Sequence, residues 1–141
     1  MQRNNHLVLD THIWVWLLNG DTSIQQSALF STIIEASRKN RLHLSAISIW
    51  EVAMLEAKGR IAFSTDITSW SREAISAPGL QLVDLQPEIS IDSTRLPGQF
   101  HGDPADRIIV ATARFLKCSL ITVDKKILAY AGEGFVDAFS L

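Results

Sequence analysis

Residues 6–18 read HLVLDTHIWVWLL and constrain the fold more than any other part of the chain. The apolar run at 6–10 is short and ends in an aspartate, which predicts a buried strand. Residues 12–18 continue apolar without glycine or proline, which predicts a helix. A buried strand followed at once by a helix is typical of α/β folds built on a parallel sheet.

The rest of the chain repeats this alternation of strand and helix. Further strands are predicted at 41–45, 80–85, 119–124 and 135–140, and further helices at 23–40, 47–58, 69–77, 87–96, 103–117 and 125–131. Ser45 can cap the helix at 47–58, and Gly59 can end it. We therefore expect one α/β domain over residues 1–141, with a mostly parallel central sheet of four to five strands and helices on both faces.

Composition indicates an ordinary globular protein. The chain is 47% hydrophobic and 20% charged, and no apolar run approaches the ~20 residues of a membrane helix. Cys118 is the only cysteine, so an internal disulfide is excluded. We therefore expect a cytoplasmic protein without a membrane partner.

The net charge of −2 does not by itself indicate nucleic-acid binding. Local basic clusters could still bind phosphate. They are Arg38, Lys39 and Arg41, then Lys58 with Arg60, then Lys125 with Lys126. Each cluster alone is better explained as a solvated helix end.

Two aspartates follow predicted strands directly. Asp10 ends the first strand and Asp124 ends "LITV". Functional groups of parallel sheets collect at these carboxyl ends, although either residue could simply cap the next helix. Asp103 precedes Pro104, which favours a capping role, and Asp106 falls in the first turn of the same helix.

Glu51 and Asp106 lie on apolar faces of their helices. Glu51 has Ile47, Ser48, Met54 and Leu55 as its neighbours at three and four residues, and Asp106 shares its face with Ile109, Val110 and Ala113. Burying an unpaired carboxylate costs several kcal/mol, so each acid needs a partner. Lys58 is the simplest partner for Glu51.

A metal ion would explain all four acids together. Like charges a few Å apart repel by ~4 kcal/mol per pair at an effective dielectric of 20. A divalent cation relieves that repulsion, and an all-oxygen ligand set favours Mg²⁺ or Mn²⁺ over zinc. Such ions activate water for attack on a phosphodiester. Thr11 offers a hydroxyl beside them, and the helix starts near Thr11 and Lys125 would favour phosphate.

Four motifs carry a family resemblance. They are LVLDTHIWVWLL at 7–18, SIWEVAML at 48–55, HGDPADRIIVATA at 101–113 and LITVDKKI at 120–127. Each motif is weak alone, but the four in order over residues 7–128 resemble the PIN-domain nucleases, and among them the VapC-type toxins of bacterial toxin–antitoxin pairs. A PIN-like fold is therefore expected.

The resemblance implies roles for named residues. Asp10, Glu51, Asp106 and Asp124 would be the catalytic carboxylates and metal ligands, with Thr11 and Asp103 supporting them. It implies endonucleolytic cleavage of RNA dependent on one or two Mg²⁺ or Mn²⁺ ions, inhibition by a cognate antitoxin, and a homodimer.

Histidines and tryptophans near the motifs stay outside this set. His12 and His101 each lie two residues from a motif aspartate, but a lone histidine is more often a surface group. Packing in the core or an interface is favoured over base stacking for Trp14, Trp16, Trp50 and Trp70. Trp14 and Trp16 cannot both face the core of one helix, so one of them is hypothesised to meet a partner chain.

Two alternatives remain open. A haloacid-dehalogenase-like phosphatase would use Asp10 as its nucleophile, but it needs a second aspartate at the position of His12. A non-catalytic binding module would use the aspartates only as helix caps. That module requires Glu51 and Asp106 to be exposed or paired with Lys58 and Arg107.

Overall fold

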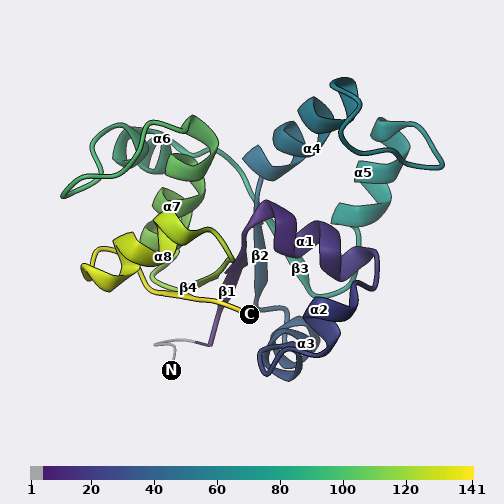
Figure 1. The fold of residues 1–141 in the computed structure, drawn as a ribbon, viewed down its shortest axis with the longest axis horizontal. Helices are drawn as coiled ribbons and strands as arrows, with labels where there is room; N and C mark the ends of the chain where they lie inside the picture. The colour runs from purple at the N-terminus through teal and green to yellow at the C-terminus, as the bar shows by residue number, and fades with distance from the viewer. Residues whose placement is uncertain (1–4) are drawn as a thin grey trace.

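Five parallel strands form the centre of the molecule in a computed structural model that describes residues 5–141. The strands are β1 (Leu7–Leu9), β2 (Leu42–Ser45), β3 (Leu80–Val83), β4 (Ser119–Ile121) and β5 (Ala138–Phe139). Their order across the sheet is β3-β2-β1-β4-β5 (Figure 1). The predicted strands are thus all present, and the sheet is parallel throughout.

Within residues 5–141, eight helices connect and flank these strands. They are α1 (Thr11–Leu18), α2 (Thr22–Gln25), α3 (Phe30–Arg38), α4 (Ile47–Ala57), α5 (Ile67–Ile75), α6 (Pro87–Thr94), α7 (Pro104–Leu116) and α8 (Lys125–Gly132). The N-cap residue of α4 is Ala46 rather than the predicted Ser45, although the Ser45 hydroxyl accepts a hydrogen bond from the Ile47 amide at 3.2 Å.

The prediction of one helix over 23–40 was wrong. The chain forms α2 and α3 instead, with a turn at 26–29. Ser27 accepts the Leu29 amide through its hydroxyl at 3.1 Å and the Phe30 amide through its carbonyl at 3.1 Å. Serine side chains can replace helical backbone hydrogen bonds in this way. The spacing of the apolar residues gives no sign of such a break.

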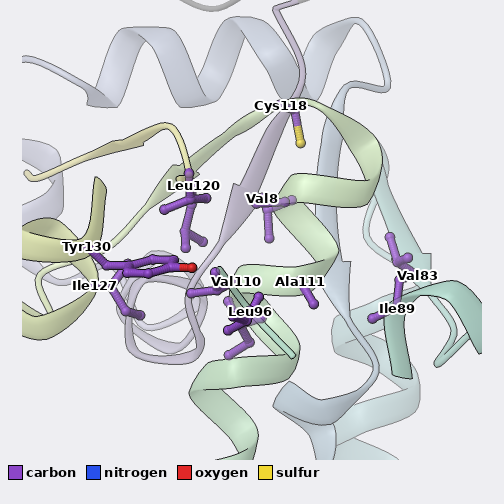
Figure 2. Packing of buried hydrophobic residues seen from close by; sticks show 13 residues of the cluster. Val8, Val83, Ile89, Leu96, Val110, Ala111, Cys118, Leu120, Ile127 and Tyr130 are labelled. Carbon is purple, nitrogen blue, oxygen red and sulfur yellow. The ribbon is translucent and has the colours of Figure 1, made fainter. Parts of the chain in front are cut away.

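Side chains of the central strand divide the core into two layers. Val8 belongs to a cluster with residues of α6, α7 and α8, shown in Figure 2. Leu7 and Leu9 point to the opposite face, where they pack with residues of α1 to α5. Helices therefore cover both faces of the sheet, as expected (Figure 1).

The strand order places a crevice at the carboxyl end of the sheet. β1 pairs with β2 on one side and with β4 on the other. The chain builds the sheet outward from β1 through β2 to β3 and then returns to add β4 and β5 on the other side, so the strand order reverses between β1 and β4. In open parallel sheets, ligands bind outside the carboxyl ends of strands at such a switch. Asp10 and Asp124 follow β1 and β4 and therefore reach this crevice together.

In the part of the chain that the structure describes, no helix is both long enough and apolar enough to span a bilayer.

Candidate functional site

Asp10 lies at the centre of the crevice. It is 5% exposed and caps α1, because Oδ1 accepts the Thr11 amide at 2.8 Å. Oδ2 accepts a hydrogen bond from the Thr122 hydroxyl at 2.6 Å. Burial raises the pKa of Asp10, and nearby Asp124 raises it further, while the hydrogen bonds from Thr122 and Thr11 lower it.

Asp124 is joined to Asp10 through Thr122. The Thr122 hydroxyl accepts the Asp124 amide at 2.9 Å while it donates to Asp10. Asp124 caps α8 with Oδ1, which accepts the amides of Lys126 and Ile127 at 2.8 and 3.0 Å. The capping role considered from sequence is therefore real for both aspartates, and it coexists with a place in the crevice.

Glu51 reaches the crevice from α4. Its Oε1 accepts a 2.5 Å hydrogen bond from the Thr11 hydroxyl, which lies 2.8 Å from the hydroxyl of buried Ser48. Burial raises the pKa of Glu51, and the charges of Asp10 and Asp103 raise it further.

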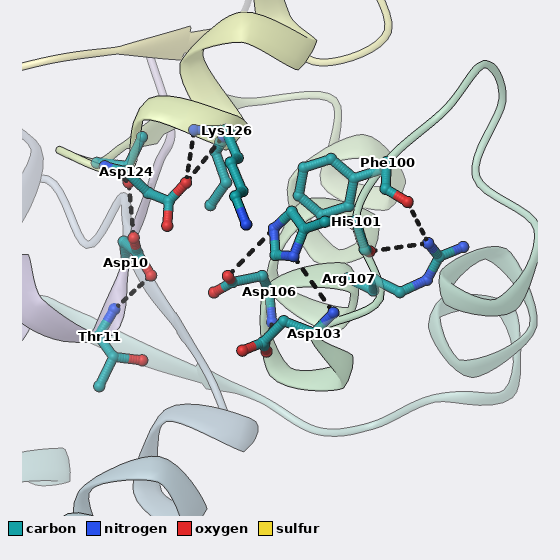
Figure 3. A network of polar contacts seen from close by, with 11 residues as sticks. Asp10, Thr11, Phe100, His101, Asp103, Asp106, Arg107, Asp124 and Lys126 are labelled. Carbon is teal, nitrogen blue, oxygen red and sulfur yellow. Dashed lines mark hydrogen bonds and ion pairs between the residues drawn. The ribbon is translucent and has the colours of Figure 1, made fainter.

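Asp106 faces the same crevice from the first turn of α7 (Figure 3). Its pKa is raised to about 7, mainly by burial and in addition by the charges of Asp103, Asp10, Asp124 and Glu51. Asp103 caps α7, accepting the Asp106 amide at 3.1 Å.

One pocket thus contains all four predicted carboxylates. It is lined by Asp10, His12, Trp16, Glu51, Asp103, Asp106, Val123 and Asp124. Residues separated by more than a hundred positions meet here, and the charge of Asp124 raises the pKa of both Asp10 and Asp106. The sequence prediction that these acids converge is confirmed, whereas their roles as catalytic groups and ligands stay predictions.

The donor set suits a hard divalent cation, since the pocket presents carboxylate oxygens and no thiolate. Within residues 5–141, no three acidic, histidine or cysteine side chains are already arranged as an ion-binding group. Binding would therefore require carboxylates to rotate toward a common point. Asp106 has the most to gain, because a nearby cation would stabilise the charged form that burial disfavours.

The purely structural explanations of Glu51 and Asp106 fail. Neither Lys58 nor Arg107 forms an ion pair with them among the contacts of residues 5–141. Lys58 is exposed, and Arg107 donates to backbone carbonyls instead.

Sequence reasoning predicted Thr11 as a supporting hydroxyl but missed two others. Thr122 and Ser48 are fully buried, and no periodicity distinguishes them from other small polar residues. Each lies two or three residues before a motif acid, at Asp124 and Glu51, and that proximity was the available signal. The role of His101 stayed open in the sequence; in the structure its ring is 19% exposed and contacts Asp106.

Trp14 and Trp16 lie in different surroundings, as their two-residue spacing in one helix requires. Trp14 is buried in the core against Trp70, and Trp16 is half-buried and lines the acidic pocket beside His12. Packing is therefore confirmed for Trp14 and Trp70. Trp50 is 54% exposed on α4.

Basic residues approach the pocket at the start of α8. Lys125 and Lys126 begin α8 directly after Asp124, and Figure 3 shows the Lys126 side chain extending toward the carboxylates. Arg38 and Lys39 instead pair with Glu35 at the end of α3, at 3.9 and 3.2 Å.

Comparisons with known proteins agree with this geometry. A family model described as the PIN domain matches residues 7–133. Ribonuclease VapC22 of Mycobacterium tuberculosis is 31% identical over 124 residues, which are 88% of this chain and 91% of that protein. The crystal structure of VapBC2 from Rickettsia felis bound to a promoter DNA fragment shares the fold, with a TM-score of 0.66 and 16% identity over 95% of this chain and 97% of that one.

Proposed function

Because the chain belongs to the PIN-domain family, we propose that it is a metal-dependent endoribonuclease and the toxin of a toxin–antitoxin pair. The observation that carries the proposal is the meeting of Asp10, Glu51, Asp106 and Asp124 in one pocket. The similarity to a protein named as a ribonuclease supports RNA as the substrate.

The four carboxylates would hold one or two Mg²⁺ or Mn²⁺ ions, and nucleases of this family generally depend on divalent metal. When bound, such ions supply an activated water and stabilise the charge that develops on the phosphate oxygens. Asp103 stays a supporting residue, since it caps α7.

Hydroxyl groups keep the carboxylates in place. Thr122 fixes one oxygen of Asp10, and Thr11 fixes one oxygen of Glu51. Both donors are buried, so water cannot easily replace them. The acids are thereby oriented before substrate arrives, which is the arrangement that makes positioning effective in catalysis.

RNA would approach over the start of α8. Lys125 and Lys126 place positive charge beside an otherwise acidic pocket, and this charge would attract the phosphate backbone. A cognate antitoxin and a homodimeric state follow from the resemblance to VapC-type toxins and belong to the same proposal.

Cleavage of RNA by the purified protein tests the proposal. We expect cleavage with Mg²⁺ or Mn²⁺, none with EDTA, and a loss of at least about a hundredfold in Glu51→Gln, because one charged ligand is gone. Asp66→Asn is the matched control. Asp66 caps α5 through the Ser69 amide at 3.0 Å and lies outside the pocket, so this variant should keep full activity.

Wild-type cleavage rates in Glu51→Gln would contradict the assignment of Glu51 to the active site.

The phosphatase alternative predicts a phosphoaspartate at Asp10 after incubation with a phosphate ester, detectable by mass spectrometry. Both oxygens of Asp10 accept hydrogen bonds and the side chain is buried, which argues against a nucleophilic role.

A further inference from the structure

His101 occupies the loop between α6 and α7, where it meets the third carboxylate of the pocket. We infer that His101 is a positioning residue that orients Asp106, and that Arg107 in turn holds His101 in place. This inference rests on the proposed function and deepens it, since it assigns two residues of the same site.

Contacts of the imidazole define which nitrogen carries the proton. Nδ1 accepts a hydrogen bond from the Asp103 amide at 3.3 Å, so the proton of the neutral ring lies on Nε2. Nε2 lies 3.3 Å from Oδ2 of Asp106 (Figure 3). The backbone at Asp103 therefore selects the tautomer that presents an N–H group to the carboxylate.

Asp106 is the one polar partner that this N–H group has within the described residues. Nε2 is buried and forms no other polar contact there, and its alignment with Oδ2 is short of a good hydrogen bond. A small rotation of Asp106 would align the two groups. The ring itself packs against Phe100 with centroids 4.2 Å apart, so the imidazole has little freedom to turn away.

Arg107 fixes the backbone that carries His101. Its Nε donates to the Ser93 carbonyl at 2.7 Å, and its Nη1 donates to the carbonyls of Phe100 and His101, both at 3.1 Å. The guanidinium thus ties the end of α6 and the loop to α7. Arg107 follows Asp106 directly, so the same helical turn supplies the carboxylate and the guanidinium that holds the His101 backbone.

This arrangement would leave Asp106 with one oxygen held and one free for an ion. Groups that hydrogen-bond to metal ligands orient them, and removing such a group typically lowers metal affinity by 10- to 100-fold. The structure thereby separates two roles on α7, with Asp106 toward the pocket and Arg107 toward the loop.

Calorimetric titration of the full chain with Mn²⁺, without RNA, tests the inference. We expect His101→Leu to weaken Mn²⁺ binding by about tenfold, because it keeps apolar packing against Phe100 but lacks the N–H group. His101→Gln should restore affinity to within about threefold, since its amide nitrogen can occupy the place of Nε2. Cleavage by His101→Leu should need more Mn²⁺ yet approach the wild-type kcat at saturation.

Arg107→Ala and Arg114→Ala form a matched pair on one helix. Arg114 also donates to a backbone carbonyl, that of Phe135 at 2.6 Å, and pairs with Asp92 at 2.9 Å, away from the pocket. Both variants should lower Tm, but only Arg107→Ala should weaken Mn²⁺ binding. Equal Mn²⁺ affinity in both variants would contradict the role given to Arg107.

The outcomes separate this inference from the proposed function. Failure of the wild-type protein to bind Mn²⁺ and to cleave RNA would overturn the proposed function itself. Normal wild-type behaviour with unchanged Mn²⁺ affinity in His101→Leu would overturn the inference alone. If His101→Leu does not fold, His101→Gln is compared with His101→Asn, whose shorter side chain cannot reach Asp106, and equal affinities would also overturn it.

Discussion

Asp106 connects the chemistry of the pocket to the stability of the protein. Its pKa is raised to about 7 from an ordinary 3.8, so the folded state prefers the protonated form. Protonated Asp106 therefore stabilises the folded state relative to the unfolded state. This contribution is fully present below about pH 4 and is lost as pH rises through 7. Asp10 and Glu51, whose pKa values are raised mainly by burial, act in the same direction.

Asp106→Asn should therefore stabilise the metal-free protein at high pH. We expect a gain in Tm of about 2–4 °C at pH 8, corresponding to ~1 kcal/mol, and a smaller gain at pH 5. Calorimetry in EDTA at both pH values measures it. Asp66→Asn should show the opposite sign at pH 8, because hydrogen bonds from Ser69 lower the pKa of Asp66. Equal effects of Asp106→Asn at the two pH values would refute the coupling.

The Thr122 hydroxyl contacts both the carboxylate of Asp10 and the backbone amide of Asp124. Thr122→Val removes the donor to Asp10 and the acceptor for the Asp124 amide at nearly constant volume. We expect a loss of about 1–3 kcal/mol in stability and about tenfold or more in cleavage rate. Urea unfolding and single-turnover cleavage measure the two losses.

Thr112→Val is the control for that change. Thr112 is equally buried, and its hydroxyl donates to the Ile108 carbonyl within α7. This variant should cost at most about 1 kcal/mol and leave the cleavage rate unchanged. Similar cleavage losses in both variants would mean that burial of a hydroxyl, rather than its contact with Asp10, is what matters.

The sequence predicted the acids and the supporting residue Thr11, but not Thr122, which holds Asp10. Asp10 and Asp124 could be placed because strand ends are visible in the apolar pattern, and Glu51 because it interrupts an apolar face. The partner hydroxyls come from other segments, 112 positions away for Thr122 and Asp10. Such contacts depend on strand order, which local patterns do not encode.

Three helices begin at the pocket, each with an aspartate as its cap. Asp10, Asp103 and Asp124 cap α1, α7 and α8. The positive ends of these helices lessen the repulsion among the carboxylates, which helps the metal-free fold to tolerate them. The starts of these three helices were predicted because aspartate and proline are common there. The break between α2 and α3 was not predicted, because it is made by a serine that does not change the spacing of the apolar residues.

Gly79 sets the turn between α5 and β3. It has φ +88°, and a Cβ placed there would lie 2.0 Å from the Ser37 carbonyl oxygen on α3. Gly79→Ala should cost about 3 kcal/mol or more in urea unfolding. Gly59→Ala shares the positive φ, at +72°, but meets nothing within 4 Å, so it should cost only about 1–2 kcal/mol. Equal losses would show that the contact with α3 is unimportant.

For the molecule as a whole, ion binding and folding should be linked. An ion that binds only the folded protein stabilises it by about 2.7 kcal/mol at a hundred times its Kd. We therefore expect Mn²⁺ to raise the Tm of the wild type and of Asp66→Asn by several degrees, and that of Glu51→Gln by less. Differential scanning fluorimetry measures the shift, and an identical rise in all three proteins would locate Mn²⁺ outside the pocket.

The order in which the pocket residues occur along the chain also bears on how the cell makes this protein. Thr122, which holds Asp10, is added to the growing chain 112 positions after it, and β4 must then insert beside β1. A nascent chain therefore lacks a complete set of carboxylates until Asp124 has been added. An enzyme that cleaves RNA would in this way stay inactive while the segments between these residues are being translated.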